Sequence, residues 1–191
     1  MTSINPDSRY SLLTITLHWL TFILIVGVYA FMELRELFPK GSDPREAMKA
    51  LHFMLGLTIL LLVLPRMATL LLGHTPAIQP EPPAWQQLMA EMAHLALYLF
   101  MLIMPVLGWL TLSAGGKTIP FYSFELPALI KENKELGKFL KEIHATIGEI
   151  GYFLIGLHVI AAFFHHFKQR DNTLTRILPA RKADPSTPSQ S

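Results

Sequence analysis

The sequence predicts an all-α integral membrane protein, built as a bundle of four membrane-spanning helices. Of its 191 residues, 51% are hydrophobic, and the mean hydropathy of +0.38 exceeds that of ordinary soluble domains. The apolar residues form four runs, each long enough to cross the roughly 30 Å hydrocarbon core of a bilayer as a helix. We therefore expect one four-span domain over residues 1–179.

Each apolar run is bounded by charged or turn-forming residues, as expected of a membrane span. The first run carries a histidine and is longer than the apolar core of a secretory signal peptide, so we interpret it as a span and not as a cleaved leader. Pro65 and Pro105 lie inside the second and third runs, where neighbouring helices tolerate a kink. The four predicted spans are residues 11–32, 47–72, 88–112 and 138–167.

An even number of spans places both termini on one side of the membrane, here termed side A, together with the linker 73–85. The loops 33–46 and 113–137 lie on the opposite side, termed side B. Side A carries seven Lys and Arg residues and side B nine, so the excess of positive charge that marks cytoplasmic loops does not select an orientation.

The linker 73–85 is rich in proline and predicts an extended surface connection, which makes His74 an exposed loop residue. Within the second side B loop, the charged stretch 131–138 predicts a short interfacial helix. The polar tail 180–191 is typical of a disordered segment.

The chain contains no cysteine and eight histidines. Disulfides, iron–sulfur clusters and thiolate haem ligation are thereby excluded, and imidazole remains as the obvious metal donor. The fourth run carries His144 and His158, 14 residues apart, which is close to four helical turns and a rise of about 21 Å. Two histidines on one helix face at two depths favour two stacked cofactors, and imidazole is a common axial ligand of haem iron. Gly148 and Gly151 lie between them and would let a flat ligand or another helix approach closely.

Depth in the membrane predicts which histidines share a cofactor. His18 and His158 lie at similar depth near side A, whereas His52 and His144 lie at similar depth near side B. Each pair would hold the iron of one haem, bridging the fourth helix to a different neighbour, as cofactor sites in helix bundles do.

Other polar groups near side A have more than one interpretation. His94 is a possible replacement for His18 or His158, a hydrogen-bond donor to a haem propionate or small molecule, or a satisfied interface residue. Arg66 lies 14 residues after His52, where its guanidinium would pair with propionates of the His18–His158 haem or reach lipid headgroups. His165 continues the ligand stripe beyond His158 and is a candidate for a quinone site, although interfacial histidines also occur without function.

Four segments together resemble the bacterial cytochrome b561 family: TLHWL, ALHFMLG, IHATIGEIGYFLIGLHVIAAFFHHF and DNTLTRILP. The resemblance runs from about Tyr10 to Pro179 and is strongest to the di-haem superoxide oxidases of that family. It implies that His18, His52, His144 and His158 are axial haem ligands. It also implies a bacterial inner membrane, with side A and both termini cytoplasmic and side B periplasmic.

The resemblance implies a superoxide:ubiquinone oxidoreductase. Superoxide would be oxidised to dioxygen on side B, and two b haems would pass the electrons to ubiquinone near side A. Cations at the side B mouth would steer the superoxide anion, with Lys117, Lys138, Lys141, Arg45 and Lys49 as candidates, although side B also carries nine acidic residues.

Two alternatives remain open from the sequence. One is a b-type cytochrome subunit that relays electrons between quinone and a partner dehydrogenase or hydrogenase. The other is a haem-free structural or transport protein, which would leave four intramembrane histidines unexplained. The small net charge of +2 gives no indication of nucleic-acid binding.

Overall fold

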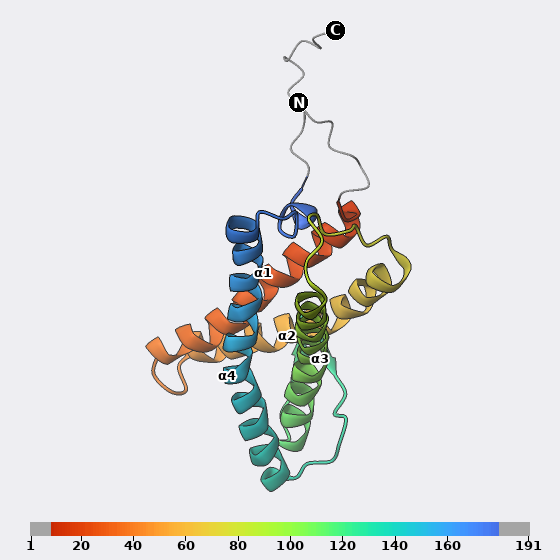
Figure 1. Cartoon of the computed structure of the whole chain (residues 1–191). Helices are drawn as coiled ribbons and strands as arrows, with labels where there is room; N and C mark the ends of the chain where they lie inside the picture. Colours follow the sequence, from red (N-terminus) through yellow and green to blue (C-terminus); the bar gives the residue numbers. More distant parts are fainter. Residues whose placement is uncertain (1–8, 180–191) are drawn as a thin grey trace, which may run out of the picture.

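A computed structural model describes residues 9–179, which are mostly helical (Figure 1). Four long helices follow one another along the chain, and each is long and apolar enough to cross a membrane. The predicted four-helix membrane fold is confirmed, whereas the predicted disorder of 180–191 lies outside the described residues. The helices are α1 (Leu12–Leu34), α2 (Asp43–Leu72), α3 (Ala84–Ala114) and α4 (Lys134–Phe164).

Local capping signals set where the helices begin. Ser11 Oγ accepts a hydrogen bond from the Thr14 amide at 3.2 Å, and Asn133 Oδ1 accepts one from Leu136 at 3.0 Å, so both satisfy amides that a helix start leaves free. Because Asn133 caps α4, the charged residues Lys134, Glu135 and Lys138 belong to the beginning of this helix. The expected separate interfacial helix at 131–138 is therefore wrong.

The side B loops contain more structure than the sequence indicates. Strands β1 (Ile119–Phe121) and β2 (Phe124–Leu126) form a small antiparallel hairpin. Ile119 is 2% exposed and packs with Leu57 and Leu112, and the hairpin tip lies on α2, where the Tyr122 hydroxyl is 3.0 Å from Thr58 Oγ1. The hairpin therefore covers the side B end of the bundle.

On side A the chain turns back after α4 and fastens three segments together. The turn η3 (His165–Gln169) and the short helix η4 (Thr175–Ile177) belong to this C-terminal segment, residues 165–178. Asn172 bonds to Gln79 through both its amide and its side chain, and the Ile177 carbonyl accepts a hydrogen bond from Trp19 Nε1 at 2.9 Å. Residues 73–83 of the linker are free of helix and strand, as predicted, whereas Ala84 and Trp85 already belong to α3. The linker is held in place by the C-terminal segment.

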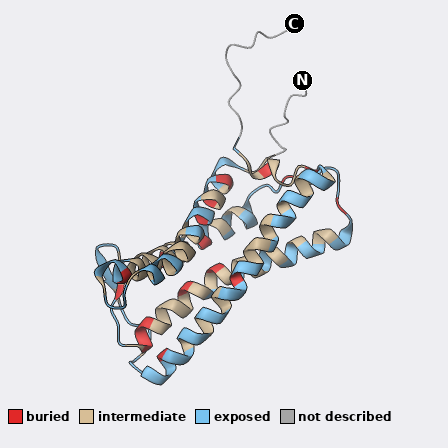
Figure 2. Cartoon of the chain, turned by 90° about the vertical axis from the view of Figure 1, so that its left-hand side faces the viewer, coloured by how far each residue is buried: buried red, intermediate tan, exposed pale blue. Residues whose placement is uncertain are grey.

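The bundle consists of two antiparallel pairs: α1 packs on α2, α3 packs on α4, and α2 and α3 join the pairs. The backbones of α1 and α4 make almost no close approach to each other. Figure 2 shows that much of the helical surface is exposed, and the exposed positions include large apolar side chains such as Leu72 and Phe153. An apolar exterior of this kind suits contact with lipid.

Two side-chain hydrogen bonds join α1 and α4: the Tyr152 hydroxyl donates to Glu33 Oε1 at 2.7 Å, and Tyr29 makes the other. Its hydroxyl donates a hydrogen bond to the Gly148 carbonyl at 2.7 Å, and a Cβ added at Gly151 would meet that hydroxyl and the ring of Phe100. The sequence left open whether a flat ligand or another helix lies against Gly151. The structure shows helix packing, because side chains of Tyr29 and Phe100 fill the space beside this glycine.

We expect Gly151→Ala to destabilise the bundle by about 1–3 kcal/mol, because the new methyl group lies 2.5 Å from Phe100 Cζ in a packed region. Thermal unfolding in detergent should show a lower midpoint. Gly156→Ala is the matched control, since a Cβ there meets nothing within 4 Å. Equal midpoints for the two variants would contradict the packing described here.

Candidate functional site

His52 on α2 and His144 on α4 face each other near side B, with ring centroids 6.1 Å apart. His52 Nδ1 lies 3.0 Å from the Val28 carbonyl oxygen, which can only accept, so the hydrogen bond assigns the proton to Nδ1 and leaves a lone pair on Nε2. His144 Nδ1 is buried without a hydrogen-bond partner. Both imidazoles therefore keep a ring nitrogen available for a ligand.

A cavity of about 360 Å³ contains this pair and is lined by residues from all four helices. Three glycines lie on its walls: Gly56 one turn after His52, Gly148 one turn after His144, and Gly108 on α3. A Cβ at Gly56 would meet no atom within 4 Å, and one at Gly108 would lie 3.4 Å from His144 Cε1. The small residues thus keep space open directly beside the two imidazoles.

His18 on α1 and His158 on α4 form a second pair near side A, with ring centroids 6.4 Å apart. His94 on α3 also approaches His158, at 5.5 Å between centroids. The structure therefore brings three histidines together here, and α4 supplies the central one.

Arg66 reaches this side A cluster from α2. Its Nη2 lies 3.5 Å from His18 Nδ1, its guanidinium carbon is 5.7 Å from the centre of the Tyr98 ring, and its Nε is buried without a partner. No ion pair involves Arg66 among residues 9–179. A guanidinium held against the histidines favours binding of an anion at this point over contact with lipid headgroups.

His165 lies at the side A end of α4, where Nδ1 is 2.5 Å from Asp171 Oδ2. Burial alone would raise the pKa of the Asp171 carboxyl, but hydrogen bonds with His165 and Thr173 outweigh burial and hold that pKa below its ordinary value. The carboxylate is therefore ionised at neutral pH. Near this end of the bundle, Arg9 donates to the Leu178 carbonyl at 3.0 Å and so helps to hold the C-terminal segment.

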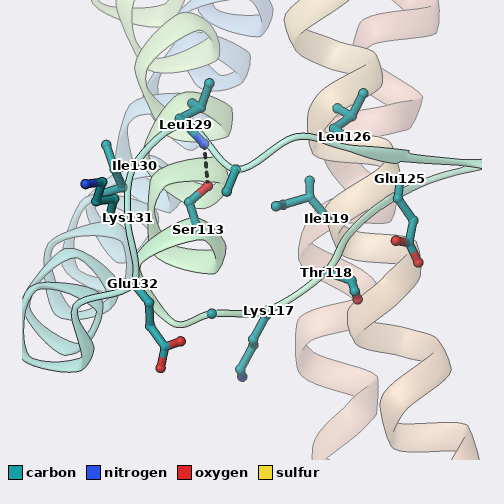
Figure 3. A pocket seen from close by; sticks show the side chains of 12 residues that line it. Ser113, Lys117, Thr118, Ile119, Glu125, Leu126, Leu129, Ile130, Lys131 and Glu132 are labelled. Carbon is teal, nitrogen blue, oxygen red and sulfur yellow. Dashed lines mark hydrogen bonds between the residues drawn. The ribbon is translucent and has the colours of Figure 1, made fainter.

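The side B cations have different surroundings. Lys141 lines the cavity that contains His52 and His144. Lys117 lines a separate, more open hollow of about 650 Å³ beneath the hairpin, together with Glu125 and Glu132 (Figure 3). Lys138 is exposed on the first turns of α4.

Arg45 and Lys49 are also predicted to steer an anion. The prediction is wrong for Arg45, because its guanidinium is buried and already bonded to other residues. Arg45 is 8% exposed, donates to the Phe38 carbonyl at 2.9 Å and makes a bidentate pair with Glu36. Its charge is therefore used to fix the loop between α1 and α2. Lys49 is paired with Glu46 at 2.6 Å.

Comparison with known proteins defines the family. A family model described as prokaryotic cytochrome b561 matches residues 9–180. The chain belongs to the prokaryotic cytochrome b561 family. Such cytochromes are membrane proteins that bind b-type haem and transfer electrons, so the resemblance inferred from the sequence is confirmed.

Three relatives match over nearly their whole length. "Cytochrome b561 homolog 1" of Escherichia coli K12 is 40% identical over 175 residues, which cover 92% of this chain and 99% of the relative. "Probable superoxide oxidase CybB" of Yersinia pestis is 33% identical over 174 residues, which cover 91% of this chain and 98% of the relative. "Cytochrome b561 homolog 2" of Escherichia coli K12 is 25% identical over 185 residues, which cover 96% of this chain and 98% of the relative.

The residues of this cytochrome b561 fit a haem at each histidine pair. In each pair a ring from α4 faces a ring from another helix, at 6.1 Å and 6.4 Å between centroids, so His52 with His144 and His18 with His158 would be able to hold haem iron through imidazole nitrogen, which is a common ligand of that iron. His94 lies 5.5 Å from His158 between ring centroids and is a further imidazole beside the side A pair.

Several contacts of the site could not be read from the sequence. The Val28 carbonyl that orients His52 has no side-chain signal. Asp171 is different, because it begins the DNTLTRILP segment and follows His165 by only six residues. A carboxylate six residues after an interfacial histidine is a signal that a search for acid–histidine pairs would have found.

Proposed function

We propose that this cytochrome oxidises superoxide on side B and reduces ubiquinone near side A. The proposal is carried by the two histidine pairs, which lie at the two ends of α4 and bridge it to α2 and to α1. That arrangement supports an electron path across the membrane. The choice of superoxide as donor is supported by the 33% identical relative whose name is probable superoxide oxidase.

His52 and His144 are the proposed axial ligands of the side B haem, and His18 and His158 those of the side A haem. Each haem, when bound, supplies a site for one-electron transfer. Arg66 is the proposed partner of a propionate at the side A site, because its buried guanidinium has no acidic partner among the described residues. His94 is proposed as a polar neighbour of that site and not as a ligand.

The overall reaction is balanced by two superoxide anions, each giving up one electron to become dioxygen, and one ubiquinone, which takes up two electrons and two protons to become ubiquinol. Lys141 attracts the anion to the side B cavity, which Lys141 lines together with His52 and His144. The part of His165 is to donate a proton at side A, where electrons leave.

Superoxide-driven reduction of ubiquinone by the purified protein alone tests this function. Superoxide generated enzymatically should yield dioxygen and ubiquinol at a ratio of two to one, and ubiquinol formation should stop when a superoxide dismutase is present in excess. Ubiquinol formation that requires an added dehydrogenase would instead support a relay subunit. A purified protein without haem absorption would contradict both.

Replacing either member of the side B pair, as in His52→Ala or His144→Ala, should halve the haem content, because the side B haem loses one of its two imidazole ligands while the side A haem keeps both. Optical redox spectra and a pyridine haemochrome assay measure the content and show which haem is missing. His94→Ala is the matched control and should retain both haems. Loss of the side A haem on replacing His52 would show that the proposed pairing is incorrect.

Removing the charge of Lys141 in Lys141→Gln should slow haem reduction by superoxide about threefold to tenfold at low ionic strength, and the difference should shrink as salt is added. Stopped-flow absorbance after mixing with superoxide measures the rate. Lys117→Gln is the control, because Lys117 lines the separate hollow. Equal losses for both variants would indicate a general surface field and not a steering role for Lys141.

We also propose that the protein lies in a bacterial inner membrane with both termini and side A cytoplasmic. The chain has no cysteine, so single introduced cysteines report on topology without background. Ser123→Cys at the hairpin should react with a membrane-impermeant maleimide added to intact spheroplasts, and Thr75→Cys in the linker should react only after lysis. The reverse pattern would place superoxide oxidation and quinone reduction on the opposite faces.

A further inference from the structure

The turn that ends α4 brings a carboxylate against His165. After the turn His165–Gln169, Arg170 adopts a left-handed conformation with φ 56°, which reverses the chain. The Asp171 amide then donates to the His165 carbonyl at 3.2 Å, while Asp171 Oδ2 lies 2.5 Å from His165 Nδ1. Backbone and side chain of Asp171 thus both engage the same residue.

Asp171 is fixed more firmly than a surface carboxylate. Its side chain is 1% exposed, and its second oxygen, Oδ1, accepts a hydrogen bond from the Thr173 amide at 2.8 Å. The His165 side chain retains 18% exposure, and its Nε2 makes no hydrogen bond within residues 9–179. The imidazole is therefore held from one side and accessible from the other, an arrangement in which a buried acid orients a histidine for proton transfer.

The surface next to His165 is apolar and aromatic. Phe163, Phe164 and Phe167 are 49%, 50% and 70% exposed, and the rings of Phe163 and Phe167 stack at 6.0 Å between centroids. Exposed phenylalanines on a membrane-spanning helix face lipid, which is where the ring and tail of a quinone partition. An accessible imidazole nitrogen beside such a surface suits a quinone carbonyl oxygen.

We infer that Asp171 is a positioning residue for quinone reduction: it holds the His165 imidazole with Nε2 toward the quinone carbonyl. This inference rests on the proposed function. As ubiquinone takes up two electrons, His165 donates a proton from Nε2 to one carbonyl oxygen, forming an O–H bond, and is reprotonated from water on side A. The second proton comes directly from water, which completes ubiquinol.

Charges around the pair come mainly from its own turn. His166, Lys168 and Arg170 flank it, and Lys168 and Arg170 are exposed to solvent. The α3 residue that reaches this turn is Gln86, which accepts from Gln169 Nε2 at 2.9 Å and carries no charge. From the linker, Gln79 and Ala77 contact Asn172 and are also neutral. Asp171 is therefore the anion that acts on His165.

Reoxidation of pre-reduced protein by a short-chain ubiquinone tests the inference without superoxide. The protein is reduced with a stoichiometric amount of dithionite and mixed with increasing concentrations of the quinone in a stopped-flow instrument. The dependence of the rate on quinone concentration separates quinone binding from the reaction of bound quinone. In Asp171→Asn, which removes the carboxylate while keeping the side-chain shape, the rate at saturating quinone should fall about tenfold, while the half-saturating quinone concentration should stay the same.

Conservative and structural controls separate positioning from folding. Asp171→Glu keeps a carboxylate and should retain part of the rate that Asp171→Asn loses, whereas Asn172→Ala removes hydrogen bonds to the linker and should leave the rate at saturating quinone unchanged. Both haems and the unfolding midpoint should be retained in Asp171→Asn.

An unchanged rate at saturating quinone in Asp171→Asn, or the same loss in Asn172→Ala, would overturn the inference while leaving the proposed function intact. Failure of ubiquinone to reoxidise the wild-type protein would overturn both.

Discussion

Four imidazoles inside the membrane-spanning helices are the constraint on which the arrangement of this protein depends. A histidine within a bilayer is costly unless it is partnered, and here each of the four lies opposite another, at 6.1 Å and 6.4 Å between ring centroids. Because α4 carries one member of both pairs, α1 and α2 must both turn their histidines toward the same helix. The backbones of α1 and α4 nevertheless stay apart, and a cavity of about 360 Å³ contains His52 and His144.

The features that follow from periodicity could be predicted from the sequence. Length and hydropathy define the four spans, and the rise of a helix places His18 level with His158 and His52 level with His144. The structure brings these rings together as the depth argument requires, while their ligation of haem iron stays a proposal. The role of His94 was harder to predict. His18 and His94 both lie beside His158, and depth in the membrane does not tell which of the two is its partner.

Contacts that depend on tertiary packing could not be predicted in the same way. Arg45 looks like a free cation in the sequence, but the loop folds so that its guanidinium reaches two carbonyls and Glu36. Gly151 looks like an opening for a flat ligand, and Tyr29 from another helix fills it. In both cases the local pattern is compatible with two partners, and only the three-dimensional arrangement selects one.

The two ends of the bundle differ in a way that suits two different substrates. On side B, the cavity at His52 and His144 is lined by ionisable residues of both signs, the cations Arg35 and Lys141 and the acids Glu33, Glu36 and Glu149, so a small water-borne anion has a polar approach. On side A, the C-terminal segment is bonded to the linker and to Trp19 of α1, which covers the bundle end with hydrogen-bonded chain. His165 and lipid-facing phenylalanines remain accessible beside it. Because a quinone reaches its site through the membrane and needs protons from water, it requires an apolar approach and a polar group at the interface, and this end of α4 supplies both.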